Sequence, residues 1–169
     1  MKKVIVCFLS VMLVFLAGTS MVLAQEDVDT YASCKYCGMK RAMFSHSRML
    51  LTYDDGTELG TCSIHCLAVD LALDIDRTPK AIQVADYNTK SLTGAETAAW
   101  VIGGSKPGVM TKRAKWAFEK QADAAAFIKA NGGTAATFDE AMKATYEDMY
   151  SDTKMIRAKR NKMKAHKKM

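Results

Sequence analysis

Residues 48–73 read RMLLTYDDGTELGTCSIHCLAVDLAL and predict a β-hairpin followed by a helix. The apolar strand at 48–53 runs into an Asp-Gly turn at 54–56, and the chain returns as a second strand over 57–61. An Asp-Gly pair between two such runs is a strong short-range signal for a hairpin, because the turn needs a residue that tolerates positive φ.

The end of the same stretch predicts a helix and then a third strand. Ser63 stands at the N-cap position, and the apolar positions after it recur at i, i+3, i+4 and i+7. We expect this helix to end near Asp76 and residues 81–87 to form a strand. The stretch therefore predicts a ββαβ unit.

The second half of the chain predicts the same order of elements. Two strands, a helix and a short last strand are expected at residues 98–102, 114–118, 121–130 and 134–137. Asn131-Gly132-Gly133 is a strong stop signal for the helix. We therefore predict an α+β fold with two related ββαβ halves, at about 34–88 and 97–138, inside a domain that spans 25–140.

The chain ends in a predicted helix and a basic tail, which we assign to residues 141–169. Thr137 and Glu140 have the spacing of a capping box for a helix that begins at Phe138. Eight basic and no acidic side chains fall within 153–169. We expect the last fifteen residues to be frayed or disordered. The basic end is either solvated or in contact with an anionic membrane surface or an acidic partner.

The N-terminus has the features of a cleaved secretory signal. Lys2 and Lys3 precede an apolar run, and Val22-Leu23-Ala24 places small residues at the −3 and −1 positions of a cleavage site. We assign residues 1–24 to a signal peptide and expect a periplasmic or secreted protein.

Net positive charge is confined to the two ends of the chain. After removal of the signal, 22 basic and 18 acidic residues give a net charge of +4, yet residues 25–152 alone carry 14 basic and 18 acidic residues, or −4. The basic isoelectric point therefore describes the tail, and we expect no nucleic-acid partner. The sequence has no phosphate-binding loop and no Ser-His-Asp set, so we do not expect an enzyme.

The motif Cys34-Lys35-Tyr36-Cys37-Gly38-Met39 predicts a tight turn that presents soft ligands, after an extended polar lead-in at 25–33. Two thiols and a thioether lie within this motif, and Gly38 supplies backbone freedom behind the second cysteine. Thiolate and thioether sulfur favour Cu(I), whereas Zn(II) gains little from a thioether. A positive neighbour such as Lys35 can also lower the pKa of a thiol.

A second pair of cysteines, Cys62 and Cys66, falls at the start of the first predicted helix, with His65 beside it. Residues four apart lie on one face of a helix. Together the two pairs are also the ligand set of a structural tetrahedral zinc site. Disulfides are a further alternative in an exported protein, although these short-range pairs would close only small loops. His65 is either an exposed helix residue or a ligand.

Met110 is a candidate ligand from the second half. It lies in a Gly- and Pro-containing loop before a predicted strand, at a place that parallels Met39 in the first half. A site between the halves would combine Met110 with Met39 or Cys37.

Several segments of the chain resemble segments of the NosL family, and they follow one another in the same order. The members of this family are copper-binding accessory proteins of nitrous-oxide reductase. The similarity begins at Cys37-Gly38-Met39 and continues through VADYNT at 84–89 and AWVIGGS at 99–105. It extends from Ala117-Phe118 to Gly132-Gly133 and covers roughly residues 34–140 in all.

The resemblance implies a periplasmic Cu(I) carrier with two ββαβ halves. It also implies that the ligands include Cys37 and Met39, with Met110 as a further candidate. We predict a non-enzymatic metallochaperone that passes Cu(I) by ligand exchange to a copper-accepting periplasmic protein, for which the resemblance implies a nitrous-oxide reductase. The candidate metal ligands are Cys34, Cys37, Met39, Cys62, Cys66 and Met110. The alternatives are a structural module with Zn(II) in a four-cysteine site and a thiol redox protein.

Overall fold

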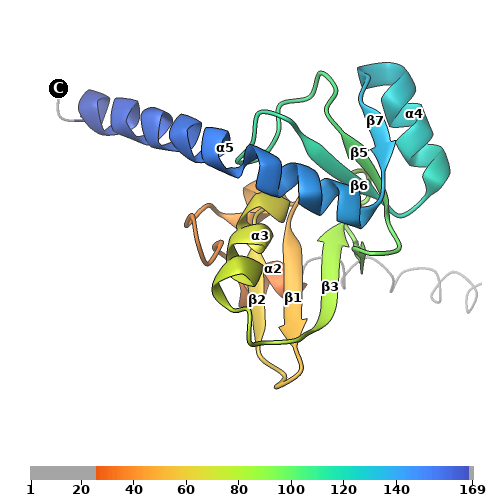
Figure 1. Cartoon of the computed structure of the whole chain (residues 1–169), viewed down its shortest axis with the longest axis horizontal. Helices are drawn as coiled ribbons and strands as arrows, with labels where there is room; N and C mark the ends of the chain where they lie inside the picture. Colours follow the sequence, from red (N-terminus) through yellow and green to blue (C-terminus); the bar gives the residue numbers. More distant parts are fainter. Residues whose placement is uncertain (1–25, 168–169) are drawn as a thin grey trace, which may run out of the picture.

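The computed structural model describes residues 26–167, so the predicted signal peptide lies outside the described part of the chain. A four-stranded and a three-stranded sheet stand one above the other, and a long helix passes over both (Figure 1). Every strand pairing is antiparallel. The combination of helices with antiparallel sheets confirms the predicted α+β class.

The first half contains the predicted hairpin, helix and third strand. Its elements are β1 (Met49–Tyr53), β2 (Glu58–Thr61), α3 (Ile64–Leu73), β3 (Pro79–Ala85) and β4 (Leu92–Gly94), and the sheet order is β2-β1-β3-β4. The central strand β1 is almost wholly buried, which explains its continuous apolar sequence. Gly56 takes φ +81° in the turn between β1 and β2.

The second half repeats this arrangement. Its elements are β5 (Ala99–Ile102), β6 (Lys115–Phe118), α4 (Gln121–Asn131) and β7 (Thr134–Ala136), and the sheet order is β6-β5-β7. In both halves the first strand is central and pairs with the second strand on one side and with the strand after the helix on the other. The shared order confirms the predicted repeat of two ββαβ halves.

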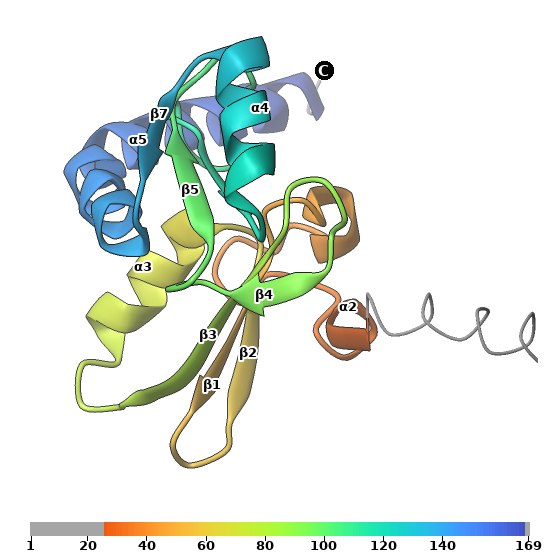
Figure 2. The same ribbon diagram turned by 90° about the vertical axis from the view of Figure 1, so that its right-hand side faces the viewer.

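Strand β5 separates two cores because successive side chains of a strand point to opposite faces. Trp100 faces the first core, where it stacks at 5.7 Å between ring centroids on Phe138. Ala99 and Val101 face the second core, together with Phe127 of α4. Figure 2 shows the consequence, with α4 and the following helix on opposite sides of the second sheet.

Three short elements were not expected from the sequence. The lead-in forms α2 (Glu26–Thr30) instead of an extended segment, a 3-10 turn η2 covers Arg41–Phe44, and β4 adds an edge to the first sheet. Contacts distant in sequence stabilise α2, since its only buried residue is Val28 and its Asp27 pairs with arginines of the hairpin region. Helix α3 also ends at Leu73, before the expected Asp76.

The last helix, α5 (Phe138–Lys167), is longer than expected. Its start confirms the capping box, because the Thr137 hydroxyl accepts the Glu140 N–H at 3.2 Å and the Glu140 carboxylate accepts the Thr137 N–H at 2.7 Å. The expected fraying of 155–167 is wrong, since this stretch continues the helix without a glycine or proline.

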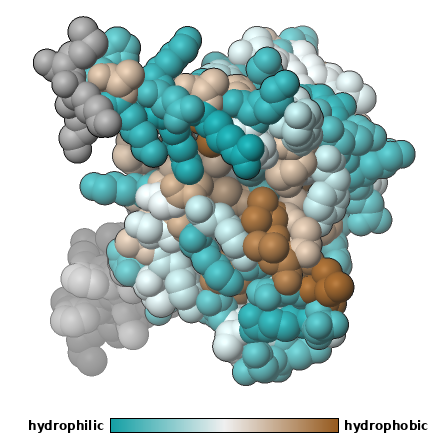
Figure 3. Space-filling model, turned by 60° about the vertical axis from the view of Figure 1, so that its left-hand side comes forward, coloured by the Kyte–Doolittle hydropathy of each residue, from teal (hydrophilic) through white to brown (hydrophobic). Residues whose placement is uncertain are grey.

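The C-terminal part of α5 projects beyond the body of the protein (Figure 1), and hydrophilic side chains gather along the top of the face from which it projects (Figure 3). Among residues 26–167, no helix is long and apolar enough to span a membrane.

Candidate metal centre

Four cysteine sulfurs meet at the boundary between the two halves. The Sγ atoms of Cys34, Cys37, Cys62 and Cys66 all lie within 4.8 Å of one another. The distance between Sγ atoms is 3.4 Å from Cys37 to Cys62 and 3.8 Å from Cys62 to Cys66. All four are free thiols. The structure thus joins the two cysteine pairs of the sequence into one cluster.

The first pair is held by a tight turn, as the motif predicts. The Cys34 N–H donates to the Met39 carbonyl at 2.9 Å, and the Gly38 N–H donates to the Cys34 carbonyl at 3.0 Å. Gly38 takes φ +72°, a conformation that a side chain disfavours. This backbone arrangement turns the chain back on itself between the two cysteines.

The second pair is positioned by the junction of β2 and α3. Cys62 directly follows the last residue of β2, and the Ser63 carbonyl accepts the N–H of Cys66 at 3.1 Å. Ser63 occupies the predicted N-cap position, but its hydroxyl makes no capping hydrogen bond and lies 3.8 Å from the Cys62 sulfur. The first turn of α3 therefore places Cys66 beside Cys62.

Asp70, a fully buried residue of α3, anchors the first cysteine turn. Its carboxylate accepts hydrogen bonds from Lys35 at 3.2 Å and from the hydroxyls of Tyr36 and Tyr53. Burial, and after it the hydrogen bond to Asp70, raises the pKa of Tyr36 and of Tyr53. Lys35 thus points to a carboxylate rather than to the thiols, which differs from the sequence-based expectation.

A second buried carboxylate, Asp27, anchors the other end of that turn. It pairs with Arg41 at 2.6 Å and with Arg48 at 2.8 Å. The Arg41 side chain is fully buried and also donates to the Thr61 carbonyl at 3.2 Å, one residue before Cys62. Burial raises the pKa of Asp27, but the hydrogen bonds and charges of Arg48 and Arg41 outweigh it and lower that pKa overall. Sequence reasoning missed both carboxylates because their partners lie far away in the chain.

The two candidate methionines belong to the surroundings of the second core, which also contains the buried cysteines. Met39 and Met110 are half-buried and pack against the hydrophobic core that contains Cys34, Cys62 and Cys66. Met110 takes φ +62°, an unusual conformation for a residue with a side chain. Such strain persists only where the surroundings impose it, and it is frequent at functional sites.

His65 is buried, which excludes the exposed-residue interpretation. Its Nδ1 atom lies 4.0 Å from an Asp152 carboxylate oxygen of α5, and neither atom has a hydrogen-bond partner among the described residues. The other oxygen of Asp152 accepts the backbone N–H of Lys112 at 3.0 Å. The cysteine helix is therefore covered by α5 and by the loop after Met110.

The pKa values of the four thiols are shifted in different directions. Hydrogen bonds from Cys37, Cys62 and Cys66 lower the pKa of Cys34. For Cys37, the hydrogen bond with Cys34 raises the pKa, but those with Cys62 and Cys66 outweigh it and lower the pKa to about 7. Hydrogen bonding with Cys34 and Cys37 raises the pKa of Cys62 and of Cys66. The thiolate character of the cluster thus concentrates on the first pair.

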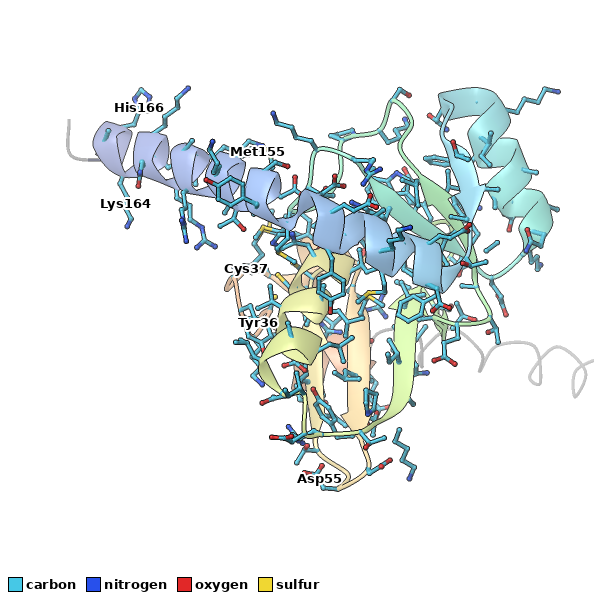
Figure 4. All side chains as sticks on the ribbon, viewed as in Figure 1. Tyr36, Cys37, Asp55, Met155, Lys164 and His166 are labelled. Atoms are coloured by element: carbon cyan, nitrogen blue, oxygen red, sulfur yellow. The ribbon has the colours of Figure 1, made fainter. Side chains whose placement is uncertain are left out.

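Exposure also distinguishes the four sulfurs. Cys34, Cys62 and Cys66 are buried, whereas Cys37 is half-exposed. Figure 4 shows Cys37 and Tyr36 below α5, with Met155 on the opposite side of the same helix. Cys37 is therefore the sulfur that a soft ion or a partner can reach first.

Comparison with known proteins identifies the family. The sequence model of NosL matches residues 25–146. The chain belongs to the NosL family. A solved structure of a NosL, the crystal structure of the copper chaperone from Shewanella denitrificans, is 27% identical in sequence with a TM-score of 0.52. The match covers 64% of this chain and 87% of that chain. A comparison with curated proteins gave no match. The matched NosL region ends within α5, so residues 147–167 of that helix extend beyond it.

Proposed function

We propose that this protein is a Cu(I) carrier, which binds the ion through the cysteine cluster and passes it to a copper-accepting protein outside the cytoplasm. The observation that carries this proposal is the convergence of four free cysteine sulfurs within 4.8 Å in a member of the NosL family. Thiolates are the preferred ligands of Cu(I). The similar protein from Shewanella denitrificans is itself described as a copper chaperone.

The arrangement of the sulfurs suits transfer of an ion. The thiolate character of Cys34 and Cys37 supplies the first ligands, and the half-exposed Cys37 gives an incoming or departing ion a path to solvent. Met39 and Met110 pack against the core that contains the buried cysteines and are proposed as exchangeable thioether ligands. Ligand exchange then begins at Cys37 and Met39, while the buried sulfurs of Cys62 and Cys66 retain the ion until a partner replaces the outer ligands.

A structural zinc site is the second candidate, and one observation favours it. A zinc–sulfur bond of about 2.3 Å in a tetrahedral site places sulfurs roughly 3.8 Å apart. The 3.8 Å between Cys62 and Cys66 fits that value, and the 3.4 Å between Cys37 and Cys62 is close to it. We favour Cu(I) because a closed cage of four buried thiolates would not need a half-exposed cysteine or neighbouring thioethers.

Anaerobic titration with Cu(I) against a competing chelator tests the proposal. The reduced chain without residues 1–24 is compared with Cys37→Ser, Met39→Leu and, as a control, Met142→Leu, whose side chain packs in the first core away from the cysteines. We expect tight binding that is lost in Cys37→Ser, weakened in Met39→Leu and unchanged in Met142→Leu. Negligible Cu(I) affinity, together with co-purified zinc whose removal unfolds the domain, would establish the zinc module instead.

We further propose a periplasmic location and a nitrous-oxide reductase as the acceptor of the copper. The support is the signal-like N-terminus and the membership in the NosL family. The test is to mix the Cu(I)-loaded protein with copper-free reductase and to measure the copper in each protein after separation. Copper that stays with the carrier would exclude this acceptor but not the carrier function.

A further inference from the structure

A groove of about 570 Å³ lies between one flank of α5 and the loop that follows Met110. Lys112 contributes from the loop, and α5 contributes Lys154, Lys159 and Lys162, together with Tyr150 and Met155. These residues of α5 recur at the spacing of a single helical face. The groove lies in the part of α5 that extends beyond the matched NosL region.

The groove carries uncompensated positive charge. All four lysines are exposed, no carboxylate lines the groove, and none of the four forms an ion pair within residues 26–167. The nearest preceding exposed carboxylates of α5 are already paired, since Glu147 lies 3.1 Å from Arg113 and Asp148 lies 2.6 Å from Lys115, while Asp152 is buried beneath the helix. An anionic ligand would therefore meet free charge here.

The groove also offers apolar contacts that a solvated basic face would not need. Tyr150 is 77% exposed, and the Lys154 ammonium lies 5.4 Å from the centre of its ring. Met155 is half-buried beside it. Tyrosine and methionine are enriched at the centre of protein interfaces, which polar, solvent-accessible residues surround.

The groove lies across α5 from the half-exposed cysteine. In Figure 4, Met155 of the groove and Cys37 lie on opposite sides of α5. Arg160 of the same helix donates a hydrogen bond at 3.1 Å to the carbonyl of Cys37. Beneath the helix, Asp152 accepts the backbone N–H of Lys112, which belongs to the groove, and lies 4.0 Å from His65, the residue before Cys66. A partner bound in the groove would thus be separated from Cys37 by the width of α5, about 10–12 Å with its side chains.

We propose that this groove binds an acidic segment, with apolar residues among its carboxylates, of the protein that accepts the copper. The assignment to the acceptor rests on the proposed carrier function. From residue 150 to 162 the groove follows about 18 Å of helix, which corresponds to roughly five or six residues of an extended chain. Carboxylates pair with the lysine rim, and an apolar side chain covers Tyr150 and Met155. An anionic bilayer would need only the basic charge of the projecting helix end and would leave the apolar floor without a function.

Binding of a synthetic peptide tests the proposal. The probe is a fluorescent peptide in which aspartate and glutamate alternate with leucine, and its matched control carries asparagine and glutamine instead. The chain without residues 1–24 is compared with the double variant Lys154→Glu/Lys159→Glu. The control variant Lys80→Glu/Lys129→Glu changes the net charge equally at exposed sites on β3 and α4.

We expect the acidic peptide to bind and the amide peptide not to bind. The groove variant should weaken binding roughly tenfold or more, while the control variant binds as the unaltered chain does. Binding should also be lost at about 1 M salt, where the Debye length is only about 3 Å.

Equal loss of peptide binding in the control variant would overturn the groove in favour of a net-charge effect. No peptide binding, with attachment to phosphatidylglycerol vesicles that depends on the same lysines, would overturn it in favour of a membrane.

Cu(I) titration of the same variants separates the two proposals. Normal Cu(I) affinity without peptide binding contradicts the groove alone. Peptide binding by a chain that does not bind Cu(I) contradicts the carrier function and, with it, the assignment of the groove to a copper acceptor.

Discussion

Single residues decide how the cysteine cluster is assembled, and two of the most important are carboxylates rather than sulfurs. Asp70 connects the first cysteine turn to α3, and Asp27 connects it to the hairpin through Arg41 and Arg48. Both carboxylates are buried, and the charge partners of Asp27 are buried with it, whereas Lys35 beside Asp70 is exposed. Removal of one partner of a buried ion pair leaves an uncompensated charge, which is more costly than the loss of a surface contact.

Replacement of Asp27 by asparagine is therefore expected to destabilise the fold by about 3–5 kcal/mol, because two buried guanidinium groups lose their counter-charge. Urea unfolding followed by tryptophan fluorescence measures the change. The exposed Asp29 on the same short helix supplies the control, and Asp29→Asn should leave the free energy of unfolding nearly unchanged.

The same variant should show a distinct dependence on pH. The pKa of Asp27 in the folded protein lies below its ordinary value of 3.8. Its stabilisation is therefore complete above that ordinary value and is lost as the pH falls through the lowered pKa. The difference in stability between the unaltered chain and Asp27→Asn should shrink below about pH 4. A difference that stays constant down to pH 2 would contradict the ion-pair explanation.

Gly60 provides a steric test of the same buried arginine. A Cβ atom at this position would lie 2.5 Å from the guanidinium carbon of Arg41. Since Arg41 is held by Asp27 and by backbone carbonyls, it has little freedom to move, and Gly60→Ala should destabilise by about 1–3 kcal/mol. Thermal unfolding measures this, and an unchanged midpoint would show that Arg41 can leave its position.

Among the elements, the long helix α5 combines two roles. Its first turns belong to the protein core, where Phe138, Ala141 and Thr145 are buried. Its later turns cover the cysteine helix through Asp152 and then extend away from the body, where their side chains are mostly exposed. The boundary between the two roles lies at Asp152, since no residue from 153 to 166 is buried.

Truncation after Asp152 should therefore preserve the fold and remove the groove. We expect the shortened chain to keep its Cu(I) affinity within a factor of about three, since no cysteine or candidate methionine is lost, and to lose binding of the acidic peptide. Circular dichroism checks the fold, and the Cu(I) competition assay checks the site. A large loss of Cu(I) affinity would show that the Arg160 contact with Cys37 supports the metal centre directly.

The elements that sequence reasoning found are those whose signals are local. The Asp-Gly turn predicts the hairpin, Gly132 predicts the end of α4, and Thr137 with Glu140 predicts the start of α5. Helix α2 and strand β4 were missed because neither has an apolar period of its own. Helix α2 depends on arginines more than ten residues away, and β4 depends on pairing with β3.

At the scale of the whole molecule, the metal centre lies between the two halves. All four cysteines come from the first half, yet they pack against the core of the second half, beside Trp116 and Phe118. Spacing in the sequence predicts two cysteine pairs and suggests one joint site, but it contains no information on the distances between the pairs. Those distances depend on the hairpin, on Asp70 and on Asp27. The contribution of Met39 and Met110 as ligands stays a prediction, because packing against the same core does not establish coordination.

X-ray absorption at the copper edge of the reduced, Cu(I)-loaded chain tests most directly whether the cysteine cluster carries copper. We predict copper in the Cu(I) state with only sulfur neighbours in its first shell, and a lower sulfur count in Cys37→Ser. A first shell that contains oxygen or nitrogen, or one that is unchanged in Cys37→Ser, would contradict copper binding at this cluster.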